Sequence, residues 1–508
     1  YMTNLFHTKE RIVMRKQVLI VCLIGVVLSS AVSCSQTQKV PDVDTEIQTE
    51  TVLETESPVQ SRLAVSVPQE LSFEGADFTF LSVGTGSSFG YYSTSDLWAE
   101  GESGEAFNDA VYKRNAAVEQ LRNVCIKTID FDDPVPEIKR SVVASDCVYD
   151  AVWAKGYGIY NLAAKGYMAD FNTLPYTALE QEWWDQNIRA DYALYGKNYA
   201  MTGHISTRDD ACTMITYFNK AMIAAYNLPS PYTLVETEQW TFDQYGEMVR
   251  AVSVDVNGDG IMTDGDTFGM IGEVGLINRM YLSLGGTFYA REPDGSLRLN
   301  ITEERNIDIY NAIFTLMSDG KYVADIEKWS NRGSDGNVYG YARSLFAQDH
   351  FLFTISLPLV IEEFRDMESD FGIVPIPRFD EQAERYYATV DVNMPLLAVP
   401  VNVPDAEKTG AVLETMAWES LYTLTPVYNE TLLKRKHARD TESADMLTLI
   451  ARSRTYNLAA ITDWGGLYSI GGEKFHAGKP LAVSDLEKKL AAANKAMEKD
   501  MEAFTAQQ

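Results

Sequence analysis

Apolar and polar positions follow two alternating patterns from residue 77 onward. Short apolar runs rich in β-branched and aromatic residues end in glycine or proline, as FTFLSVG does at 78–84. Segments with helical spacing follow such runs, and in residues 106–124 Val111, Val118 and Leu121 fall on one side of a helix. Alternation of strands and helices predicts parallel sheets with helices on both faces, which is an α/β architecture.

The alternation continues in a second unit that we expect to start near residue 213. Further strands are predicted at the runs TMITYFNK, TFGMIG, FLFTISLPLV, FGIVPIPRF and PLLAVPV. Thr241 with Gln244, and Ser484 with Glu487, are spaced as the capping boxes of two helices. A chain of 508 residues is too long for one small core, so two mixed α/β lobes are the simplest solution.

The N-terminal segment predicts export. A basic pair precedes an unbroken apolar run at 18–28, about half of what a membrane-spanning helix needs, and small residues follow it. Residues 1–33 are therefore interpreted as a signal peptide, with Met14 as the natural start. The sequence SAVSC resembles a bacterial lipoprotein lipobox, which implies cleavage before Cys34 and lipid modification of its thiol. Ala31 stands where leucine is usual in such motifs.

A polar tract connects this segment to the folded part. Residues 34–70 are rich in Thr, Glu, Ser, Gln and Pro and carry few aromatics, which predicts a disordered spacer. Fully extended, such a spacer would reach on the order of 100 Å. We therefore expect the protein on the extracellular face of the bacterial cytoplasmic membrane, held there through its lipid anchor only.

Charge excludes some partners. The chain has 43 Lys and Arg against 72 Asp and Glu, a net charge of −29. Such a field repels phosphate backbones and anionic lipid, so we expect no nucleic-acid partner. After export, and apart from the lipid-modified Cys34, three cysteines remain, Cys125, Cys147 and Cys212, with no metal-binding spacing. We interpret them as buried small hydrophobic residues, and a disulfide between Cys125 and Cys147 stays open.

Catalytic motifs are weak. The five histidines are scattered without metal-ligand spacing. GSSFG at 86–90 matches the G-x-S-x-G of hydrolases, but the sequence after it is too polar for the helix that such an elbow needs. We therefore expect no enzyme, although paired carboxylates in so acidic a chain leave a glycosidase open.

One motif is specific. Residues 255–266 read DVNGDGIMTDGD, which fits the loop D-x-N-x-D-G that binds calcium in EF-hands. The predicted oxygen ligands are Asp255, Asn257, Asp259, the carbonyl of Ile261, Thr263 and Asp266. Gly260 supplies the sharp turn, and the strand-like TFGMIG after the loop predicts a structural Ca²⁺ rather than a paired helix–loop–helix sensor.

Longer segments carry a family resemblance. FNDAVYKRNAAVEQL, YDAVWAKGY, GYMADFNTLPY, EWWDQNIRADYALYGKNYAMTG, YFNKAMIAAYNL, PYTLVETEQWTFDQYGEMVRAVSVDVNGDGIMTDGDTFG and FGIVPIPRFDEQAERYY occur in that order. Over residues 75–508 the chain resembles the extracellular solute-binding proteins of family 1. These are the substrate-binding lipoproteins of bacterial ABC importers, most of which serve carbohydrates. Gln239 stands where many relatives have glycine before WT.

The resemblance implies a two-lobed periplasmic-binding-protein fold of type II, whose lobes close like a hinge on a ligand in the interlobe cleft. It implies crossings between the lobes near 217–220, 371–377 and 424–426. We expect residues 71–216 to form the first part of the first lobe and residues 217–373 the first part of the second lobe, including the calcium loop. Residues 374–424 should return to the first lobe, and residues 425–508 should form the C-terminal helices of the second lobe.

Ligand contacts are expected in loops at the carboxyl ends of strands, where such folds face the cleft. Aromatic rings stack on the C–H faces of sugars, and planar polar groups pair with their hydroxyls. The candidates are Phe89, Tyr91, Tyr92, Trp98, Trp153, Tyr157, Arg279, Asp463 and Trp464.

The expected function is capture of a carbohydrate, an oligosaccharide in the first instance, and its delivery to the transmembrane subunits of an ABC permease. Two alternatives stay open. One is the same fold binding a non-sugar solute such as a peptide or an anionic compound. The other is a calcium-stabilised secreted glycosidase or adhesin.

Overall fold

The computed structural model of the chain describes residues 62–86, 90–332, 337–435 and 441–506. Residues 62–508 form one compact unit. The predicted signal peptide at 1–33, the lipidation of Cys34 and the Phe89 contact fall outside the described residues. Among the residues described, no helix combines the length and the apolar character that crossing a membrane requires.

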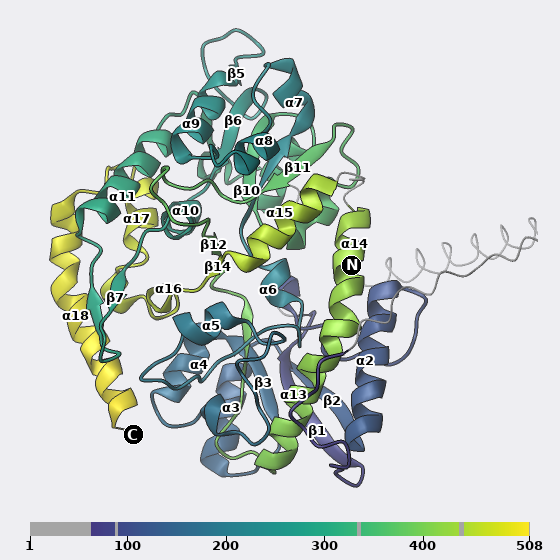
Figure 1. Cartoon of the computed structure of the whole chain (residues 1–508). Coiled ribbons are helices and arrows are strands. Elements are labelled where there is room, and N and C mark those ends of the chain that lie inside the picture. Colours follow the sequence, from purple (N-terminus) through teal and green to yellow (C-terminus); the bar gives the residue numbers. More distant parts are fainter. Residues whose placement is uncertain (1–61, 87–89, 333–336, 436–440, 507–508) are drawn as a thin grey trace, which may run out of the picture. The chain divides into compact units, whose positions relative to one another are not determined.

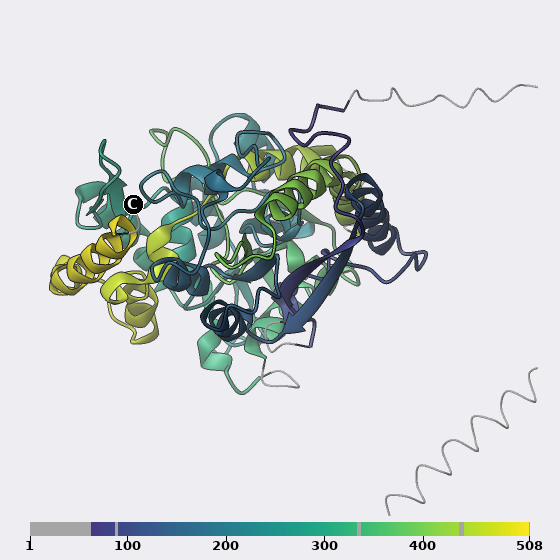
Figure 2. The ribbon, with the colours of Figure 1, turned by 90° about the horizontal axis from the view of Figure 1, so that it is seen from below.

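The first lobe is built on a four-stranded sheet in the order β13-β3-β1-β2. Its strands are β1 (Ala76–Val83), β2 (Val124–Phe131), β3 (Ala151–Lys155) and β13 (Pro395–Ala398). The first three run parallel, whereas β13 is antiparallel to β3. Its main helices are α2 (Ala106–Arg122), α3 (Pro134–Ala144), α4 (Gly156–Ala163), α5 (Gln186–Asp191) and α13 (Ala406–Tyr422). In Figure 2 the strands lie between blue helices, so both faces of the sheet are covered.

The second lobe contains a six-stranded sheet in the order β11-β4-β10-β6-β5, with β9 also paired to β6. Its strands are β4 (Ile215–Asn219), β5 (Ser253–Val254), β6 (Thr267–Gly272), β9 (Val323–Asp325), β10 (Phe351–Ser356) and β11 (Phe371–Val374). Helices around it are α7 (Lys220–Ala225), α8 (Pro231–Glu236), α9 (Phe242–Ala251), α10 (Leu276–Ser283), α11 (Glu304–Met317) and α12 (Val338–Phe346). A small hairpin joins β7 (Tyr289–Arg291) to β8 (Leu297–Leu299). Because β4 is antiparallel to both β10 and β11, the sheet is mixed, and the expectation of purely parallel sheets is wrong.

A two-stranded sheet lies between the lobes. β12 (Ala388–Thr389) pairs in parallel with β14 (Arg454–Thr455), and Figure 1 places both at the centre of the molecule. The short helix α6 (Arg208–Ala211) lies in the segment that leads into β4. We call β12, β14 and α6 the hinge. The C-terminal elements are α14 (Leu424–Arg435), α15 (Thr441–Arg452), α16 (Leu458–Thr462), α17 (Ile470–His476) and α18 (Val483–Thr505).

The expected lobe boundaries require correction. Residues 217–220 and 371–374 do not cross between lobes, because β4 and β11 pair with each other inside the second sheet. The chain also stays with the second lobe after β11, since Trp240 Nε1 donates to the Pro375 carbonyl at 2.8 Å and Arg305 pairs with Asp380 at 2.5 Å. At the third predicted crossing, α14 still packs on α2, and α15 is the helix that contacts β11.

Helix caps test local reasoning. The Thr241 hydroxyl accepts from the Gln244 N–H at 3.4 Å, which confirms Thr241 as the cap of α9. The Thr241 N–H donates to the Gln239 carbonyl at 2.9 Å, so the second half of the predicted capping box is wrong. The box expected at Ser484 and Glu487 is wrong. α18 starts at Val483, with Ser484 already inside it, and its first turn is instead capped by Asp485, whose carboxylate accepts from the Ala482 N–H at 3.2 Å.

The end of the predicted spacer is part of the fold. Arg62 pairs with Glu419 at 2.6 Å, and its guanidinium lies 5.2 Å and 5.0 Å from the ring centroids of Trp418 and Tyr422. Val67 is buried. Residues 62–70 therefore pack along α13, and the spacer boundary at residue 70 is too late.

The remaining cysteines are free thiols. Cys212 is buried, as expected, whereas Cys125 and Cys147 are exposed. The interpretation of all three as buried residues is therefore wrong, and no disulfide joins Cys125 to Cys147 in the structure.

Candidate functional site

Polar groups from both lobes meet beside the hinge. Tyr92 follows β1 in the short helix η1 (Gly90–Tyr92), Arg279 lies on α10, and Asp391 follows β12. Arg279 Nη2 lies 3.2 Å from Asp391 Oδ2. The Asp391 N–H donates to the Cys212 carbonyl at 2.9 Å, which fixes it to the segment leading into β4. We call Tyr92, Arg279 and Asp391 the interlobe cluster.

The charges of the interlobe cluster depend on one another. Burial raises the pKa of Tyr92, and the neighbouring Asp391 carboxylate raises it further. Burial alone would lower the pKa of Arg279, but Glu273, in contact with its Nη1, and Asp391 outweigh that effect and raise it. The phenol is thus neutral and the guanidinium charged at neutral pH. An uncharged donor, a cation and two carboxylates are together presented between the lobes.

One oxygen of this cluster lacks a hydrogen bond. Asp391 is 4% exposed, and its Oδ1 accepts from the Asn393 N–H at 2.8 Å and from Asn393 Nδ2 at 3.0 Å. Its Oδ2 lies 3.2 Å from Arg279 Nη2, and the Tyr92 phenol is close enough to interact with the same carboxylate, but no donor among the described residues reaches Oδ2 in good hydrogen-bond geometry. A buried carboxylate oxygen in this state favours an added donor such as a hydroxyl.

Tyrosines surround the cluster. The Tyr468 phenol is close enough to Arg279 and Asp391 to interact electrostatically with both, although burial is the main reason that its pKa is raised to about 12. Asp463 positions this residue, because its Oδ1 accepts from the Tyr468 N–H at 2.8 Å. Tyr339 on α12 is 43% exposed and lies near Glu273 and Arg279. The site therefore combines aromatic faces with paired charges.

A second contact joins the lobes at η1. Tyr91 donates its hydroxyl to Glu363 Oε1 at 2.7 Å, from η1 to the short helix η4 (Pro358–Phe364) of the second lobe. Arg343 on α12 holds the same carboxylate with Nε and Nη2 at 2.7 Å and 3.0 Å. The hydrogen bond to Glu363, and then burial, raise the pKa of Tyr91. We call Tyr91, Glu363 and Arg343 the interlobe latch.

Some of the predicted ligand residues lie at contacts between the lobes, and others lie elsewhere. Tyr91, Tyr92 and Arg279 lie in the two interlobe contacts, and Asp463 supports Tyr468 next to them. Tyr157 is 57% exposed at the start of α4. Sequence reasoning missed Asp391, Tyr468 and Glu273, none of which stands in a recognisable motif.

The two other tryptophans near strand and helix ends are core residues. Trp153 lies inside β3 and is fully buried, because β3 is covered on both faces. Trp464 is also buried, with its Nε1 donating to Asp500 at 2.8 Å and its ring 6.0 Å from that of Tyr289. In this structure neither side chain contributes a surface on which a sugar ring can stack.

Trp98 lies away from the interlobe cluster and the interlobe latch. Its side chain is 42% exposed and lines a groove beside β2 and α2, together with Tyr112. The expectation that it joins Tyr91 and Tyr92 is therefore not met in this structure.

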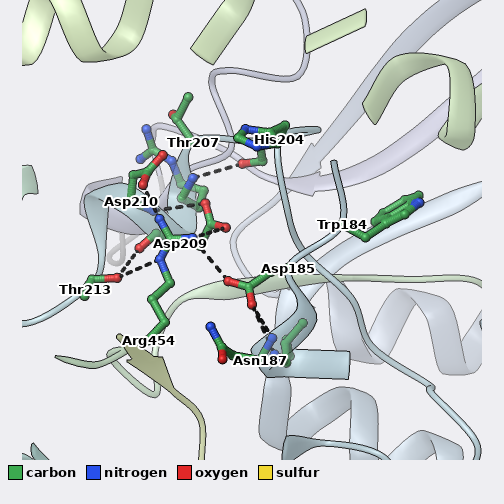
Figure 3. A network of polar contacts seen from close by, with 12 residues as sticks. Trp184, Asp185, Asn187, His204, Thr207, Asp209, Asp210, Thr213 and Arg454 are labelled. Atoms are coloured by element: carbon green, nitrogen blue, oxygen red, sulfur yellow. Dashed lines mark hydrogen bonds and ion pairs between the residues drawn. The ribbon is translucent and has the colours of Figure 1, made fainter. Parts of the chain in front are cut away.

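A buried ion network supports the hinge (Figure 3). Arg454 of β14 lies between Asp185, Asp209 and Asp210, with Nη1 3.2 Å from the carboxylates of both Asp185 and Asp209 and Nη2 on Asp210. Tyr456 donates its hydroxyl to Asp185 at 3.0 Å. Burial raises the pKa of Asp209 well above its ordinary value despite Arg454. Three carboxylates from the first lobe and α6 thus share one guanidinium from the hinge strand.

A cavity of about 630 Å³ adjoins this network. Its walls include Trp184, His204, Tyr428 and Arg452 besides the network itself. Burial lowers the pKa of His204, whose Nδ1 lies 2.9 Å from the Thr425 hydroxyl. The cavity is lined by the first lobe, by α14 and α15, and by Pro358 of η4 in the second lobe. We take the interlobe cluster as the candidate ligand site because it brings charged and polar groups from both lobes into contact.

The predicted calcium loop forms a series of tight turns. Asp255 accepts from the N–H groups of Gly258 and Gly260, both at 2.7 Å. Asp259 Oδ1 accepts from the Ile261 N–H at 2.8 Å. Gly260 has a φ of +80°, so the sharp turn predicted there is present. Asn257 Oδ1 accepts from the Asp259 N–H at 2.9 Å.

The last carboxylate of the loop, Asp266, is held by hydrogen bonds from main-chain N–H groups of the loop itself. Asp266 is buried, and its oxygens accept from the N–H groups of Val256 at 2.8 Å and Thr263 at 2.6 Å. These hydrogen bonds lower the pKa of Asp266 although burial alone would raise it. Over the described part of the chain, no group of three or more His, Cys, Asp or Glu side chains is gathered as a metal site. The all-oxygen donor set suits Ca²⁺, but binding would require the loop carboxylates to converge further.

Comparisons with known proteins identify the fold. No protein-family model matches the chain, and no curated protein matches it in sequence. Among solved structures, a cyclo/maltodextrin-binding protein complexed with maltotetraose aligns with a TM-score of 0.53 at 9% identity, over 86% of this chain and 98% of that protein. A sugar transporter from Rhizobium etli in an open conformation aligns at 0.51 and 14% identity, over 85% and 100%.

A third neighbour is the apo-form of RafE from Streptococcus pneumoniae, with a TM-score of 0.50 and 11% identity over 85% of this chain and 99% of RafE. The match spans nearly the whole length of each of these proteins. Two of the three neighbours are named for carbohydrate binding or transport, as a cyclo/maltodextrin-binding protein and a sugar transporter. The chain has their fold, a mixed α/β two-lobed periplasmic-binding-protein fold.

Proposed function

We propose that the protein is the extracellular, lipid-anchored solute-binding component of an ABC importer and that it captures a carbohydrate between its lobes. The observation that carries the proposal is the interlobe cluster. Arg279 comes from the second lobe, Tyr92 from the first and Asp391 from the segment after the hinge strand β12, so a ligand that contacts all three favours the closed arrangement.

The chemistry of the cluster suits a sugar. Vicinal hydroxyls of a pyranose can donate to a carboxylate and accept from a guanidinium at the same time. The Asp391 carboxylate supplies the acceptor, Arg279 the donor, and the rings of Tyr468 and Tyr339 supply apolar faces for C–H groups. The mixed charge of the cluster disfavours a simple anion, because Glu273 and Asp391 already neutralise Arg279.

Delivery to a membrane permease follows from the same arrangement. Lobes that close on a ligand present a different outer surface from lobes that are open, and a partner can distinguish the two by a few kcal/mol of differential contact. The predicted lipid anchor at Cys34 would keep the protein at the membrane where such a partner resides. Labelling of exported protein with a fatty acid in wild type but not in Cys34→Ser would support the anchor.

The test of sugar binding is a thermal-shift panel on the purified protein. Maltotetraose, the ligand of one structural neighbour, is the first probe, followed by other neutral oligosaccharides, short peptides and organic anions. One glycan should raise the melting temperature in a saturable way, because ligand at about 100 times its Kd stabilises the folded state by roughly 2.7 kcal/mol. Stabilisation only by a peptide or anion would overturn the carbohydrate assignment, and release of reducing sugar from a glycan would replace binding with hydrolysis.

We also propose that residues 255–266 bind a structural Ca²⁺. The support is the ligand spacing, the left-handed turn at Gly260 and the charged, preoriented carboxylate of Asp266. The residues that would hold the ion are Asp255, Asn257, Asp259, Ile261, Thr263 and Asp266. Bound there, it would neutralise the loop carboxylates and tie the segment between α9 and β6 together.

A further inference from the structure

β2 is an open edge of the first-lobe sheet. It pairs with β1 on one side, and in the described structure no strand pairs with its other side. The Phe131 carbonyl accepts from the Gly84 N–H at 3.3 Å, whereas the Ile126 N–H points the other way and donates to Glu119 at 2.8 Å. Because alternate residues of a strand direct their main-chain groups to opposite sides, Thr128 and Asp130 also direct theirs outward.

The space alongside this edge is a groove of about 650 Å³. Trp98 and Tyr112 line it from the loop after β1 and from α2, and they are 42% and 37% exposed. Ile129 lines it from β2 itself and is also exposed. Glu119 and Lys127 protect this edge near Ile126, whereas exposed apolar side chains line the groove beside it, and an exposed apolar groove of this kind points to an interaction surface.

The charge of the groove beside β2 indicates which kind of partner it can bind. Asp77, Glu100, Glu119 and Lys127 line the groove, and Lys127 is already paired with Asp77 at 2.7 Å. The unbalanced charge is negative. A second copy of this chain, with its net charge of −29, would be repelled, and so would the chain's own residues 35–61, which carry six acidic residues and one basic residue.

We propose that the open edge of β2 binds an extended basic peptide segment of a partner protein as an added strand. The outward N–H and C=O groups of Thr128 would form the main-chain hydrogen bonds, Glu100 and Glu119 would attract basic side chains, and the groove aromatics would receive apolar ones. This surface is separate from the interlobe cluster, so the proposal stands independently of sugar binding.

The probe is a fluorescent peptide of about eight residues that alternates valine with lysine, titrated into the purified protein at low salt. Thr128→Pro removes the outward donor, whereas the matched control Thr128→Ala keeps it. A Pro at such an edge position is tolerated because the lost N–H is not part of the sheet. The proline variant should bind at least about tenfold more weakly, and the alanine variant within about twofold of wild type.

Two further measurements locate the binding. The peptide should slow amide hydrogen exchange in 124–131, and Glu100→Lys should weaken binding in a salt-dependent way. Equal affinities of Thr128→Pro and Thr128→Ala, protection outside 124–131, or equal binding of the matching valine–glutamate peptide would each overturn the proposal. So would the absence of saturable binding by the lysine peptide. If Thr128→Pro does not fold, Glu100→Lys and the exchange pattern decide.

Discussion

Arg279 and Asp391 face each other between the second lobe and the hinge, with Nη2 and Oδ2 3.2 Å apart. Arg279 belongs to α10, whereas Asp391 is attached through its N–H to the Cys212 carbonyl. Bridging these two groups therefore contributes to the affinity of a ligand and also favours one angle between the lobes.

The first prediction concerns this pair. Arg279→Lys keeps the charge but loses the planar fork, and Asp391→Asn removes the buried anion. Each should weaken binding of the glycan found in the panel by about 10- to 100-fold, as expected when a hydrogen bond to a charged group worth about 1.5–3 kcal/mol is lost. Calorimetric titration measures the effect. Arg298→Lys, an exposed guanidinium paired only with Glu292 and Glu303, should bind as wild type. Unchanged affinity in both cluster variants would remove the cluster from the ligand site.

The second prediction concerns the interlobe latch. Tyr91→Phe deletes the hydroxyl that reaches Glu363 and leaves the Arg343–Glu363 pair intact. Stability should change by less than about 1 kcal/mol, because this hydrogen bond is exposed. The ligand-free protein should nevertheless open, with a larger radius of gyration by small-angle X-ray scattering. Tyr112→Phe, which alters an exposed phenol outside the latch, serves as the control.

The pH dependence of the latch has a definite sign. The pKa of Tyr91 is raised in the folded protein, so the neutral phenol and its bond to Glu363 persist through the range in which an ordinary tyrosine, with a pKa of about 10, would begin to ionise. The bond is lost only as the pH rises through the higher folded value. A Tyr91→Phe protein with the same dimensions as wild type at pH 7 would show that the latch does not hold the lobes together.

The third prediction concerns Asp209. Its folded pKa lies well above the unfolded value of about 3.9, so the folded state binds a proton that the unfolded state has released. The favourable contribution is fully present below pH 3.9 and is lost as the pH rises through the folded pKa. Asp209→Asn removes this titration. The melting temperature of the variant minus that of the wild type should therefore increase from pH 4 to pH 8.

An exposed aspartate gives the opposite sign and serves as control. Hydrogen bonds from Ser296 lower the pKa of Asp294 in the β7–β8 turn, so its contribution is present above pH 3.9 and is lost on acidification. Asp294→Asn should therefore lose a little stability relative to wild type on going from pH 4 to pH 8. A melting difference between Asp209→Asn and wild type that does not change with pH would contradict the protonated state of Asp209.

The fourth prediction concerns calcium. Chelation should lower the melting temperature of the wild-type protein, and added Ca²⁺ should restore it, because an ion bound only to the folded state adds RT ln(1 + [L]/Kd). Asp255→Ala should abolish the dependence, and Asp308→Asn, an exposed carboxylate on α11, should retain it. A melting temperature that responds neither to chelation nor to Ca²⁺ would show that the loop is held by its own turns alone.

Local patterns were sufficient for much of the fold. The apolar runs that became β1, β4 and β13 are continuous because each strand is covered on both faces, which makes them visible in the sequence. The crossings were misplaced because nothing local distinguishes a strand in one lobe from a strand in the other. Only the pairing of β4 with β11 decides it.

Local sequence patterns also indicated part of the candidate site. Tyr91 and Tyr92 follow the first strand, where a loop reaches the cleft side of an α/β sheet, and the structure places both at contacts between the lobes; their contact with a ligand stays a prediction. Trp153 was misjudged by strand register, since it lies within β3 instead of after it. Asp391 could not be found locally, because its role depends on Arg279, more than a hundred residues away, and on its attachment to Cys212.

Residues 62–70 have a mechanical consequence. Arg62 is held by Glu419, Trp418 and Tyr422, so a pull applied at the start of the folded unit is carried along α13 as shear and enters the first lobe. These contacts lie at the C-terminal end of α13, and α14 begins two residues after Tyr422. A restraint at this point would therefore act first on α13, the helix that packs against α2 in the first lobe.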